Sequence, residues 1–208
     1  MRARKKKNCD KRVEACSSLL INSPEEMISY TDKLPATLEI GCGKGGFICT
    51  LAKNNPDRFY FAAELITDVL VTALERAVEE GIENVRFLNI NAVRLPEFFK
   101  KGDISKIHLN FSDPWPKSRH AKRRLTYHTF LDLYKNILSD DGVIEIKTDN
   151  DGLFEFTLEE LALSDMKILR IERDLHKSDL AEGNVMTEYE KNFSEKGVPI
   201  KYVKVAYK

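Results

Sequence analysis

A glycine-rich turn between a short apolar segment and a helical pattern is the feature that most restricts the fold of this chain. Residues 36–42 read ATLEIGC, and the turn at residues 41–46 reads GCGKGG. Residues 46–56 then show apolar side chains at helical spacing and end at a proline. A strand that turns through glycines directly into a helix is typical of an α/β sheet. The sequence therefore predicts a parallel sheet with this turn at the carboxyl end of a strand.

Strand and helix patterns alternate from this turn through residue 163. Apolar or alternating segments predict seven strands, at residues 36–42, 58–64, 84–90, 106–112, 143–148, 166–175 and 199–208. Helical spacing predicts helices at residues 46–56, 68–80, 126–138 and 153–163. No helix is evident between the last two strands, so we expect one strand near an edge to run antiparallel. The predicted fold class is α/β, a seven-stranded, mostly parallel sheet with helices on both faces.

The charges of the chain balance in total but not along the sequence. Residues 1–12 carry seven Lys and Arg and one acid, and residues 115–124 carry five Lys and Arg and no acid. Residues 139–165 carry nine acids and one Lys. Each basic stretch is either a site for a polyanion or a solvated surface. We expect residues 1–20 to form a basic arm that stays mobile until a polyanion binds, and residues 21–208 to form one domain.

The composition argues against a membrane protein and against a metal or disulfide scaffold. With 42% hydrophobic residues the chain can bury a core, but no apolar run reaches the length of a membrane span. The basic N-terminus lacks the apolar stretch of a secretory signal. The four Cys form no C-x-x-C pair and the four His are scattered, so we expect reduced thiols and no metal site. A cytoplasmic protein is expected.

The string G-x-G-x-x-G at residues 41–46 indicates a cofactor that carries a nucleoside. Gly41 and Gly43 allow the backbone to approach a ligand closely, and the helix that follows offers free N–H groups. Glu64, at the end of the second predicted strand, can accept hydrogen bonds from both ribose hydroxyls. Asn91 follows the third strand, where its side chain could contact the adenine edge or the ribose of the cofactor. Asn is also a common turn residue.

Two cofactors, NAD and S-adenosylmethionine, satisfy this pattern. Glu39 stands two positions before the first glycine, and a carboxylate there attracts an ammonium or sulfonium group but repels a pyrophosphate. A chain of 208 residues also leaves little room for the substrate domain of a nicotinamide enzyme. S-adenosylmethionine is therefore favoured.

The fourth predicted strand ends in NFSDPWPKSRHAKRR, residues 110–124. Pro114 and Pro116 are expected to hold Asp113 and Trp115 in extended geometry. An indole can stack on a base, a carboxylate can accept from a base edge, and Lys and Arg can meet phosphates. The stretch therefore predicts a junction where a nucleobase meets the cofactor while basic side chains hold the nucleic acid backbone.

Taken together, these segments closely resemble the bacterial tRNA (guanine-N7-)-methyltransferase family. The resemblance covers nearly the whole chain and is carried by EIGCGKG (39–45), Glu64, LNFSDPWPK (109–117), HAKRRLT (120–126), KTDN (147–150), LF (153–154) and TEYE (187–190). It implies a Rossmann-like class I methyltransferase fold. It also implies transfer of a methyl group from S-adenosylmethionine to N7 of the guanine at position 46, in the variable loop of tRNA.

Carried over by matching position, the resemblance implies a role for each group of residues. Asp113 is the expected catalytic residue, and the expected cofactor contacts are Glu39, Gly41, Gly43, Glu64, Asn91 and Asp113. The expected contacts to the guanosine are Lys117, Asp149, Thr187, Glu188, Tyr189 and Glu190. The expected contacts to tRNA are Arg119, His120, Ala121, Lys122, Arg123 and Arg124. No metal is expected, and the protein is expected to be a monomer or a homodimer.

Methylation of guanine N7 requires no general base, because this nitrogen has a lone pair and no proton to lose. Catalysis is then expected from positioning, with Asp113 stabilising the charge that develops on the base. Glu188 and Glu190 are expected to accept from N1–H and N2–H₂ and so to distinguish guanine from adenine.

Two other functions fit parts of the sequence. An enzyme that methylates an exocyclic amine is one, because Asp-Pro-Trp resembles the Asn/Asp-Pro-Pro-aromatic motif of amino-methyltransferases. An RNA-binding protein without catalytic activity on the same scaffold is the other, although the acids Glu39, Glu64 and Asp113 argue against it.

Overall fold

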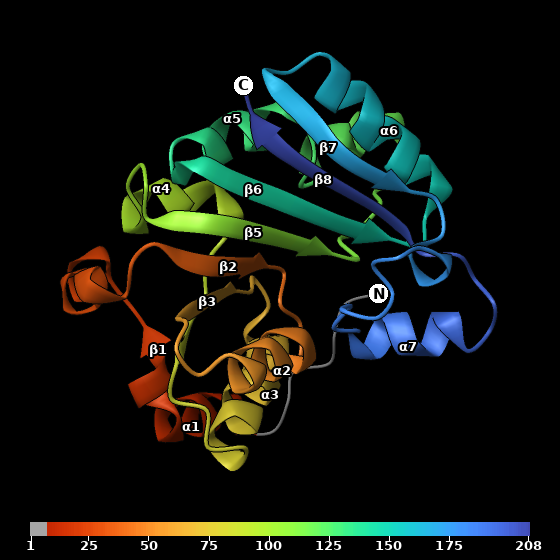
Figure 1. The fold of residues 1–208 in the computed structure, drawn as a ribbon. Helices are drawn as coiled ribbons and strands as arrows, with labels where there is room; N and C mark the ends of the chain where they lie inside the picture. The colour runs from red at the N-terminus through yellow and green to blue at the C-terminus, as the bar shows by residue number, and fades with distance from the viewer. Residues whose placement is uncertain (1–7) are drawn as a thin grey trace.

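The computed structural model describes residues 8–208, which form an eight-stranded sheet with helices on both faces (Figure 1). The order of strands across the sheet is β1-β4-β3-β2-β5-β6-β8-β7. The strands are β1 (Leu20–Ile21), β2 (Ala36–Ile40), β3 (Tyr60–Ala63), β4 (Val85–Leu88), β5 (Ile104–Asn110), β6 (Leu138–Thr148), β7 (Met166–Glu172) and β8 (Lys201–Tyr207). Strand β8 runs antiparallel to β6 and β7, and the other neighbouring pairs are parallel.

The predicted α/β class, the mostly parallel sheet and the antiparallel strand near one edge are confirmed. Residues 8–208 contain eight strands, one more than expected. The additional strand, β1, has two residues and pairs with β4 at the opposite edge. A strand of two residues shows no alternation in the sequence, so its pairing depends on tertiary packing alone.

Helices cover the two faces of the sheet in two groups, with α1, α2 and α3 on one face and α4, α5 and α6 on the other (Figure 1). The α-helices are α1 (Cys9–Ala15), α2 (Gly46–Asn54), α3 (Thr67–Glu79), α4 (Leu95–Phe98), α5 (His128–Lys135), α6 (Asp151–Ala162) and α7 (Glu188–Ser194). The 3-10 helices are η1 (Ser17–Leu19), η2 (Pro24–Lys33), η3 (Ala92–Arg94), η4 (Ser118–Arg123) and η5 (Leu175–Lys177).

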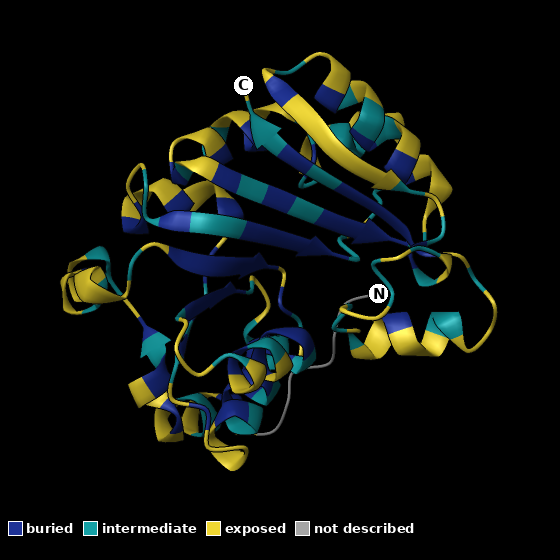
Figure 2. Cartoon of the chain, in the orientation of Figure 1, coloured by how far each residue is buried: buried dark blue, intermediate teal, exposed yellow. Residues whose placement is uncertain are grey.

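The alternation of side chains along the strands supplies a hydrophobic core on each face. In β3, Tyr60 and Ala62 pack with the helices α2 and α3, whereas Phe61 and Ala63 belong to the larger core on the other face. All four residues are buried, as expected for a central strand of a sheet that is covered on both sides (Figure 2).

The basic arm that we expected at residues 1–20 is packed structure from residue 9 onward. Helix α1 packs on α3, and Arg12 donates to both carboxylate oxygens of Glu75 at 2.6 Å. Cys9 and Cys16 are buried. The domain boundary expected at residue 21 thus falls within the folded region, and residues 1–7 lie outside the described residues.

The long link from residue 176 to residue 198 is not an irregular loop. It contains α7, which lies near the carboxyl ends of β5 and β6 (Figure 1). Thr187 and Glu190 form a capping box, in which the Thr187 hydroxyl accepts from the Glu190 N–H and the Glu190 side chain accepts from the Thr187 N–H. None of the helices in residues 8–208 combines the length and the apolar character that a membrane crossing requires.

Candidate functional site

Two adjoining cavities lie at the carboxyl ends of the parallel strands, where open α/β sheets bind ligands. The larger cavity, of about 600 Å³, is lined by Gly41, Glu64, Asn91 and Asp113, which follow β2, β3, β4 and β5 in that order. The smaller cavity, of about 350 Å³, lies between the glycine turn and α7. Gly41 and Phe111 line both cavities, so the two together form one crevice. The topology therefore brings these four predicted residues together.

The glycine turn opens this crevice because its backbone adopts conformations that other residues disfavour. Gly41, Gly43 and Gly45 have φ angles of 78°, 59° and 77°. A Cβ atom on Gly45 would lie 2.7 Å from Cβ of Ala73, so this glycine allows α2 and α3 to approach. Around Gly41 and Gly43 there is open space, which leaves room for a ligand against the backbone.

Glu64 is held against the glycine turn by two backbone groups. Its Oε2 accepts from the Gly43 N–H at 3.1 Å, and its Oε1 accepts from the Ile66 N–H at 2.9 Å. Each carboxylate oxygen retains acceptor capacity beyond one hydrogen bond. Glu64 is therefore fixed in position and can still accept from the two hydroxyls of a ribose.

Glu39 and Asn110 leave two acceptor atoms without a donor. The Asn110 side-chain amide donates to Oε1 of Glu39 at 2.9 Å, and both side chains line the smaller cavity. Among residues 8–208, Oε2 of Glu39 and Oδ1 of Asn110 are the buried side-chain polar atoms that lack a hydrogen-bond partner. Burial raises the pKa of Glu39 to about 7. A ligand that carries a positive charge and N–H donors would satisfy both atoms.

The turn that carries Asp113 is strained. Phe111 and Trp115 have φ angles of 51° and 42°, a left-handed conformation that costs roughly 1–3 kcal/mol for each residue. The expectation that Trp115 is extended before Pro116 is therefore wrong. The physical reason is Arg124, whose guanidinium donates to the carbonyl oxygens of Pro114 and Trp115, both at 3.0 Å, and fixes the turn.

Asp113 is exposed and lines the larger cavity, as Glu64 and Asn91 do. The indole of Trp115 also lines this cavity, and the guanidinium of Arg123 lies 4.8 Å from the centre of its ring. Asp113 and Trp115 therefore line the same cavity, and the junction of nucleobase and cofactor stays a prediction.

The predicted tRNA contacts have different surroundings. Lys122 and Arg123 line the larger cavity. Lys117 and Arg119, a few residues earlier in the sequence, are exposed. Arg124 differs, because its guanidinium binds the turn and lies 4.1 Å from the centre of the Phe156 ring. Its Nε and Nη2 groups donate within the protein, and a contact of Arg124 with tRNA stays a prediction. His120 packs edge-on against Trp115 and Ala121 is partly buried in η4.

The predicted guanosine contacts divide in the same way. Thr187, Glu188 and Tyr189 line the smaller cavity, and the Tyr189 hydroxyl lies 3.4 Å from Oδ2 of Asp149. Glu190 has no exposed surface and forms an ion pair with Lys147 at 2.7 Å. Glu190 is thus paired inside the protein in this structure, and its contact with guanine stays a prediction.

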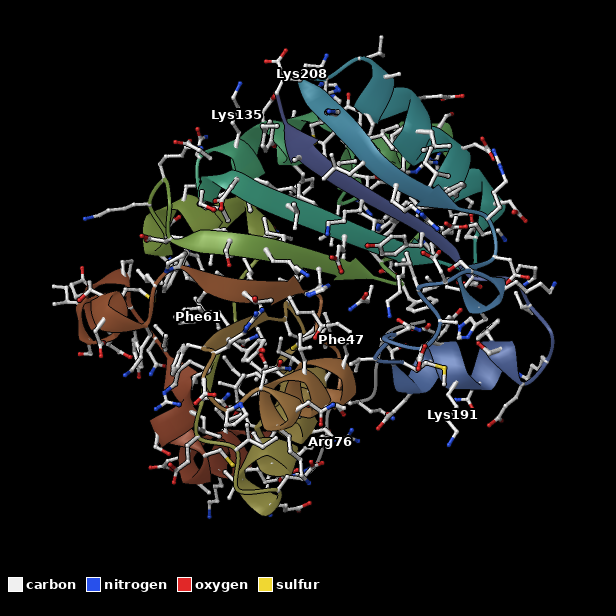
Figure 3. The ribbon with its side chains drawn as sticks, in the orientation of Figure 1. Phe47, Phe61, Arg76, Lys135, Lys191 and Lys208 are labelled. Atoms are coloured by element: carbon white, nitrogen blue, oxygen red, sulfur yellow. The ribbon has the colours of Figure 1, made fainter. Side chains whose placement is uncertain are left out.

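Several residues at the site carried no prediction. Arg76 of α3 forms an ion pair with Glu188, and the helices α2 and α3 that carry Phe47 and Arg76 lie together on one face of the sheet (Figure 3). Asn110 ends β5 and Lys147 is the last residue but one of β6, and both side chains are buried, so each needs a hydrogen-bond partner inside the protein. Their partners, however, are set by tertiary packing and could not be read from the sequence.

A third cavity, of about 620 Å³, opens on the sheet and contains none of the predicted site residues. Most of its charged side chains are paired within the protein. Glu145 lies 2.9 Å from Lys106 and 3.7 Å from Lys204, and Arg170 forms an ion pair with Asp179. Charges that satisfy one another in this way leave little demand for a ligand.

The residues of the crevice fit S-adenosylmethionine. Glu64 and Asn91 would hold its ribose and adenine in the larger cavity, and the unpaired acceptors of Glu39 and Asn110 would meet the ammonium of its amino-acid end in the smaller cavity. A pyrophosphate would instead meet the Glu39 carboxylate, which repels it.

Comparison with known proteins agrees with this geometry. The methyltransferase family model Methyltransf_4 matches residues 33–203. The chain is 46% identical to a tRNA (guanine-N(7)-)-methyltransferase of Geobacillus sp. (strain WCH70), over 100% of this chain and 96% of that protein. It is 45% identical to the protein of the same name from Bacillus cytotoxicus, over 100% of this chain and 98% of that protein.

Solved structures share the fold at low sequence identity. An antibiotic-related methyltransferase superposes with a TM-score of 0.65 at 18% identity, covering 89% of this chain and 94% of that chain. A 30S ribosomal A1408 methyltransferase from an uncultured bacterium superposes with a TM-score of 0.63 at 16% identity, covering 90% and 95%. With relatives of 45–46% identity over its whole length, this chain belongs to the tRNA (guanine-N(7)-)-methyltransferase family.

Proposed function

We propose that this protein transfers a methyl group from S-adenosylmethionine to N7 of guanine in tRNA, and that the guanine is the one at position 46 in the variable loop. The observation that carries the proposal is the crevice in which Glu64, Asn91 and Asp113 meet at the ends of three strands beside the basic turn. The names of the relatives support the reaction and the substrate class.

The chemistry at N7 places modest demands on the protein. The nitrogen attacks with an in-plane lone pair and has no proton to lose, so no base is needed and no metal is required to activate it. When bound, S-adenosylmethionine supplies an electrophilic methyl group on a sulfonium. The side chains of the crevice then contribute orientation, which in well-aligned reactions is worth up to about 7–11 kcal/mol.

Asp113 is the residue we assign to the reacting base. It lies at the mouth of the larger cavity, on a turn whose backbone is fixed by Arg124. The purine becomes cationic as N7 gains the methyl group, and a carboxylate in a fixed position stabilises this charge. Because the turn is strained and held in place, the carboxylate does not have to reorganise during the reaction.

The basic side chains near this turn would hold the tRNA backbone. Lys117, Arg119, Lys122 and Arg123 are exposed, and two of them line the cavity that contains Asp113. Lys and Arg contacts to phosphate position a nucleic acid without reading its sequence. Recognition of guanine would then come from Glu188 and Tyr189, which line the adjoining cavity. We place this activity in the cytoplasm.

Methyl transfer to an unmodified tRNA transcript, followed by mapping of the modified nucleotide by nuclease digestion and mass spectrometry, tests the proposal. We expect one N7-methylguanosine at position 46 and no product with a transcript in which that guanine is replaced by adenine. Methylation of an exocyclic amine, or of a guanine elsewhere, would contradict it. A protein that binds tRNA but transfers no methyl group would support the RNA-binding alternative.

A further inference from the structure

A buried ion pair ties α7 to the sheet. The Lys147 ammonium donates to Oε2 of Glu190 at 2.7 Å, to the carbonyl oxygen of Val185 at 2.9 Å and to Oδ1 of Asn184 at 3.0 Å. Oε1 of Glu190 accepts from the Asn184 amide at 2.6 Å and lies 3.0 Å from Nε2 of His176. The Lys147 and Glu190 side chains are 5% and 0% exposed. Each charge is therefore buried and fully satisfied, as a stable buried pair requires.

The neighbouring residues of α7 face the crevice. Glu188 forms an ion pair with Arg76 across the glycine turn, and the ring of Tyr189 lies 5.0 Å from the ring of Phe111. Together with Thr187, these two residues line the smaller cavity, which Glu39 also lines. The inward direction of Glu190 fixes the rotation of the helix, and with it the direction of Glu188 and Tyr189, because residues on one helix keep their angular spacing.

Helix α7 has only seven residues, and a helix of that length has little stability of its own. Lys191, which follows Glu190, is exposed and points away from the sheet (Figure 3). Tertiary contacts therefore determine where α7 lies, and the buried pair is the charged contact between α7 and the central sheet.

We infer that Lys147 and Glu190 are positioning residues for the methyl-transfer reaction: their buried pair holds α7 as the wall that closes the amino-acid end of the donor site, and Glu190 does not itself read guanine. This inference rests on the proposed function, since it assigns the smaller cavity to the amino-acid end of S-adenosylmethionine. Lys147 acquires a role that the sequence did not predict.

A double-mutant cycle separates a positioning pair from a direct contact with guanine. Either single change, Lys147→Met or Glu190→Gln, leaves one buried charge unpaired, whereas the double variant leaves none. Calorimetry would measure the binding of S-adenosylhomocysteine, which carries the amino-acid end, and of methylthioadenosine, which lacks it. Lys191→Met removes an exposed charge from the same helix and is the matched control.

We expect each single variant to bind S-adenosylhomocysteine about tenfold or more weakly and methylthioadenosine within about twofold of the wild type. The double variant should recover most of the lost affinity, and Lys191→Met should match the wild type. A general loss of stability would weaken both ligands alike, so the difference between them reports the position of α7. Methylation of tRNA should follow the S-adenosylhomocysteine affinity across the series.

Two results would overturn the inference. In the first, Glu190→Gln binds S-adenosylhomocysteine as tightly as the wild type but no longer methylates tRNA, and the double variant does not recover methylation. That pattern would indicate that Glu190 contacts guanine directly. The other is an equal loss for both ligands. If a single variant does not fold, the double variant and His176→Ala, which removes one partner of Glu190 and leaves Lys147 in place, still carry the comparison. Failure of the wild type to bind either ligand would instead contradict the proposed function.

Discussion

At the scale of single residues, the crevice depends on groups that are held in place before any ligand binds. Glu64 accepts from two backbone N–H groups, and the strained turn beneath Asp113 is fixed by Arg124. Glu39 is the exception, because one of its oxygens is buried without a donor. Glu64 and the turn beneath Asp113 are preorganised for binding and catalysis, whereas the free oxygen of Glu39 would obtain its donor from the ligand.

Replacing Asp113 by Ala should remove most of the turnover and leave the fold intact. Asp113 is exposed, so we expect the thermal midpoint to change by no more than about 2 °C. Loss of a fixed charge beside the developing purine cation should lower kcat by about a hundredfold or more. Single-turnover methylation of tRNA together with thermal unfolding would measure the two effects. Methylation at the wild-type rate by this variant would contradict the assignment.

The buried Glu39 carboxyl should make cofactor binding release protons. Burial raises its pKa to about 7, so about half of the ligand-free molecules carry a proton on Glu39 at pH 7. An ammonium placed beside it favours the carboxylate, so S-adenosylhomocysteine should displace about half a proton at pH 7 and almost none at pH 8.5. Calorimetry in buffers of different ionisation enthalpy measures this number, and Glu39→Gln should abolish it. Equal proton release at both pH values would contradict the role of Glu39.

The same pKa shift predicts in which direction the stability of the protein changes with pH. A carboxyl whose pKa is raised from 4.5 to about 7 on folding binds more protons in the folded state across that interval. The stability of the ligand-free protein should therefore fall as the pH rises through this window, by about 3 kcal/mol in total. Glu39→Gln should remove this part of the pH dependence. Denaturation with urea should therefore give a difference in the free energy of unfolding between variant and wild type that is not the same at pH 5 and at pH 8. A difference that stays constant with pH would contradict the raised pKa of Glu39.

At the scale of elements, the sequence pattern predicted most of the sheet because periodicity reports burial. The helices at α2, α3 and α6 begin and end within two residues of their predicted bounds. Strand β1 was missed because two residues carry no period, and α7 was missed although T-x-x-E at residues 187–190 is the signature of a capping box.

The same segment shows why the site was only partly predictable. Residues at the carboxyl ends of parallel strands, such as Glu64 and Asp113, must converge whatever the details of packing, so their meeting could be predicted. Glu190 and Arg124 could not be placed in this way. Whether a charged side chain faces a ligand or a buried partner depends on contacts with distant segments, which in these two cases are Lys147 and the carbonyl groups of the turn.

Two adjacent arginines of the basic turn should therefore respond differently to mutation. Arg123 lies at the mouth of the cavity, whereas both Arg124 hydrogen bonds are made to the turn. Arg123→Met should reduce the slope of log K against log salt for tRNA binding by about 0.7–0.9. Arg124→Met should leave that slope unchanged and lower kcat by about tenfold or more, since the turn beneath Asp113 loses its support. A smaller salt slope in Arg124→Met, with the slope unchanged in Arg123→Met, would instead show that Arg124 contacts the phosphate backbone.

At the scale of the whole molecule, the hydrophobic cores and the polar crevice lie in different parts of the sheet. The hydrophobic cores on both faces hold the strands rigidly, while the polar groups of the crevice lie where β2, β3, β4 and β5 end. Net charge is zero for the chain as a whole, so attraction of a polyanion has to come from local patches. A ligand in the crevice contacts several strands at once, and its binding energy therefore stabilises the domain as a unit.

This coupling predicts a ligand-dependent thermal midpoint that identifies the cofactor class. At a concentration one hundred times its Kd, a ligand that binds only the folded state adds about 2.7 kcal/mol to the free energy of unfolding. For a chain of this size we expect S-adenosylhomocysteine to raise the midpoint by about 5–10 °C under those conditions. NAD at the same concentration should leave it unchanged, because its pyrophosphate would meet the buried Glu39. Differential scanning calorimetry measures both shifts, and the assignment of the crevice to S-adenosylmethionine fails if NAD stabilises the protein as strongly.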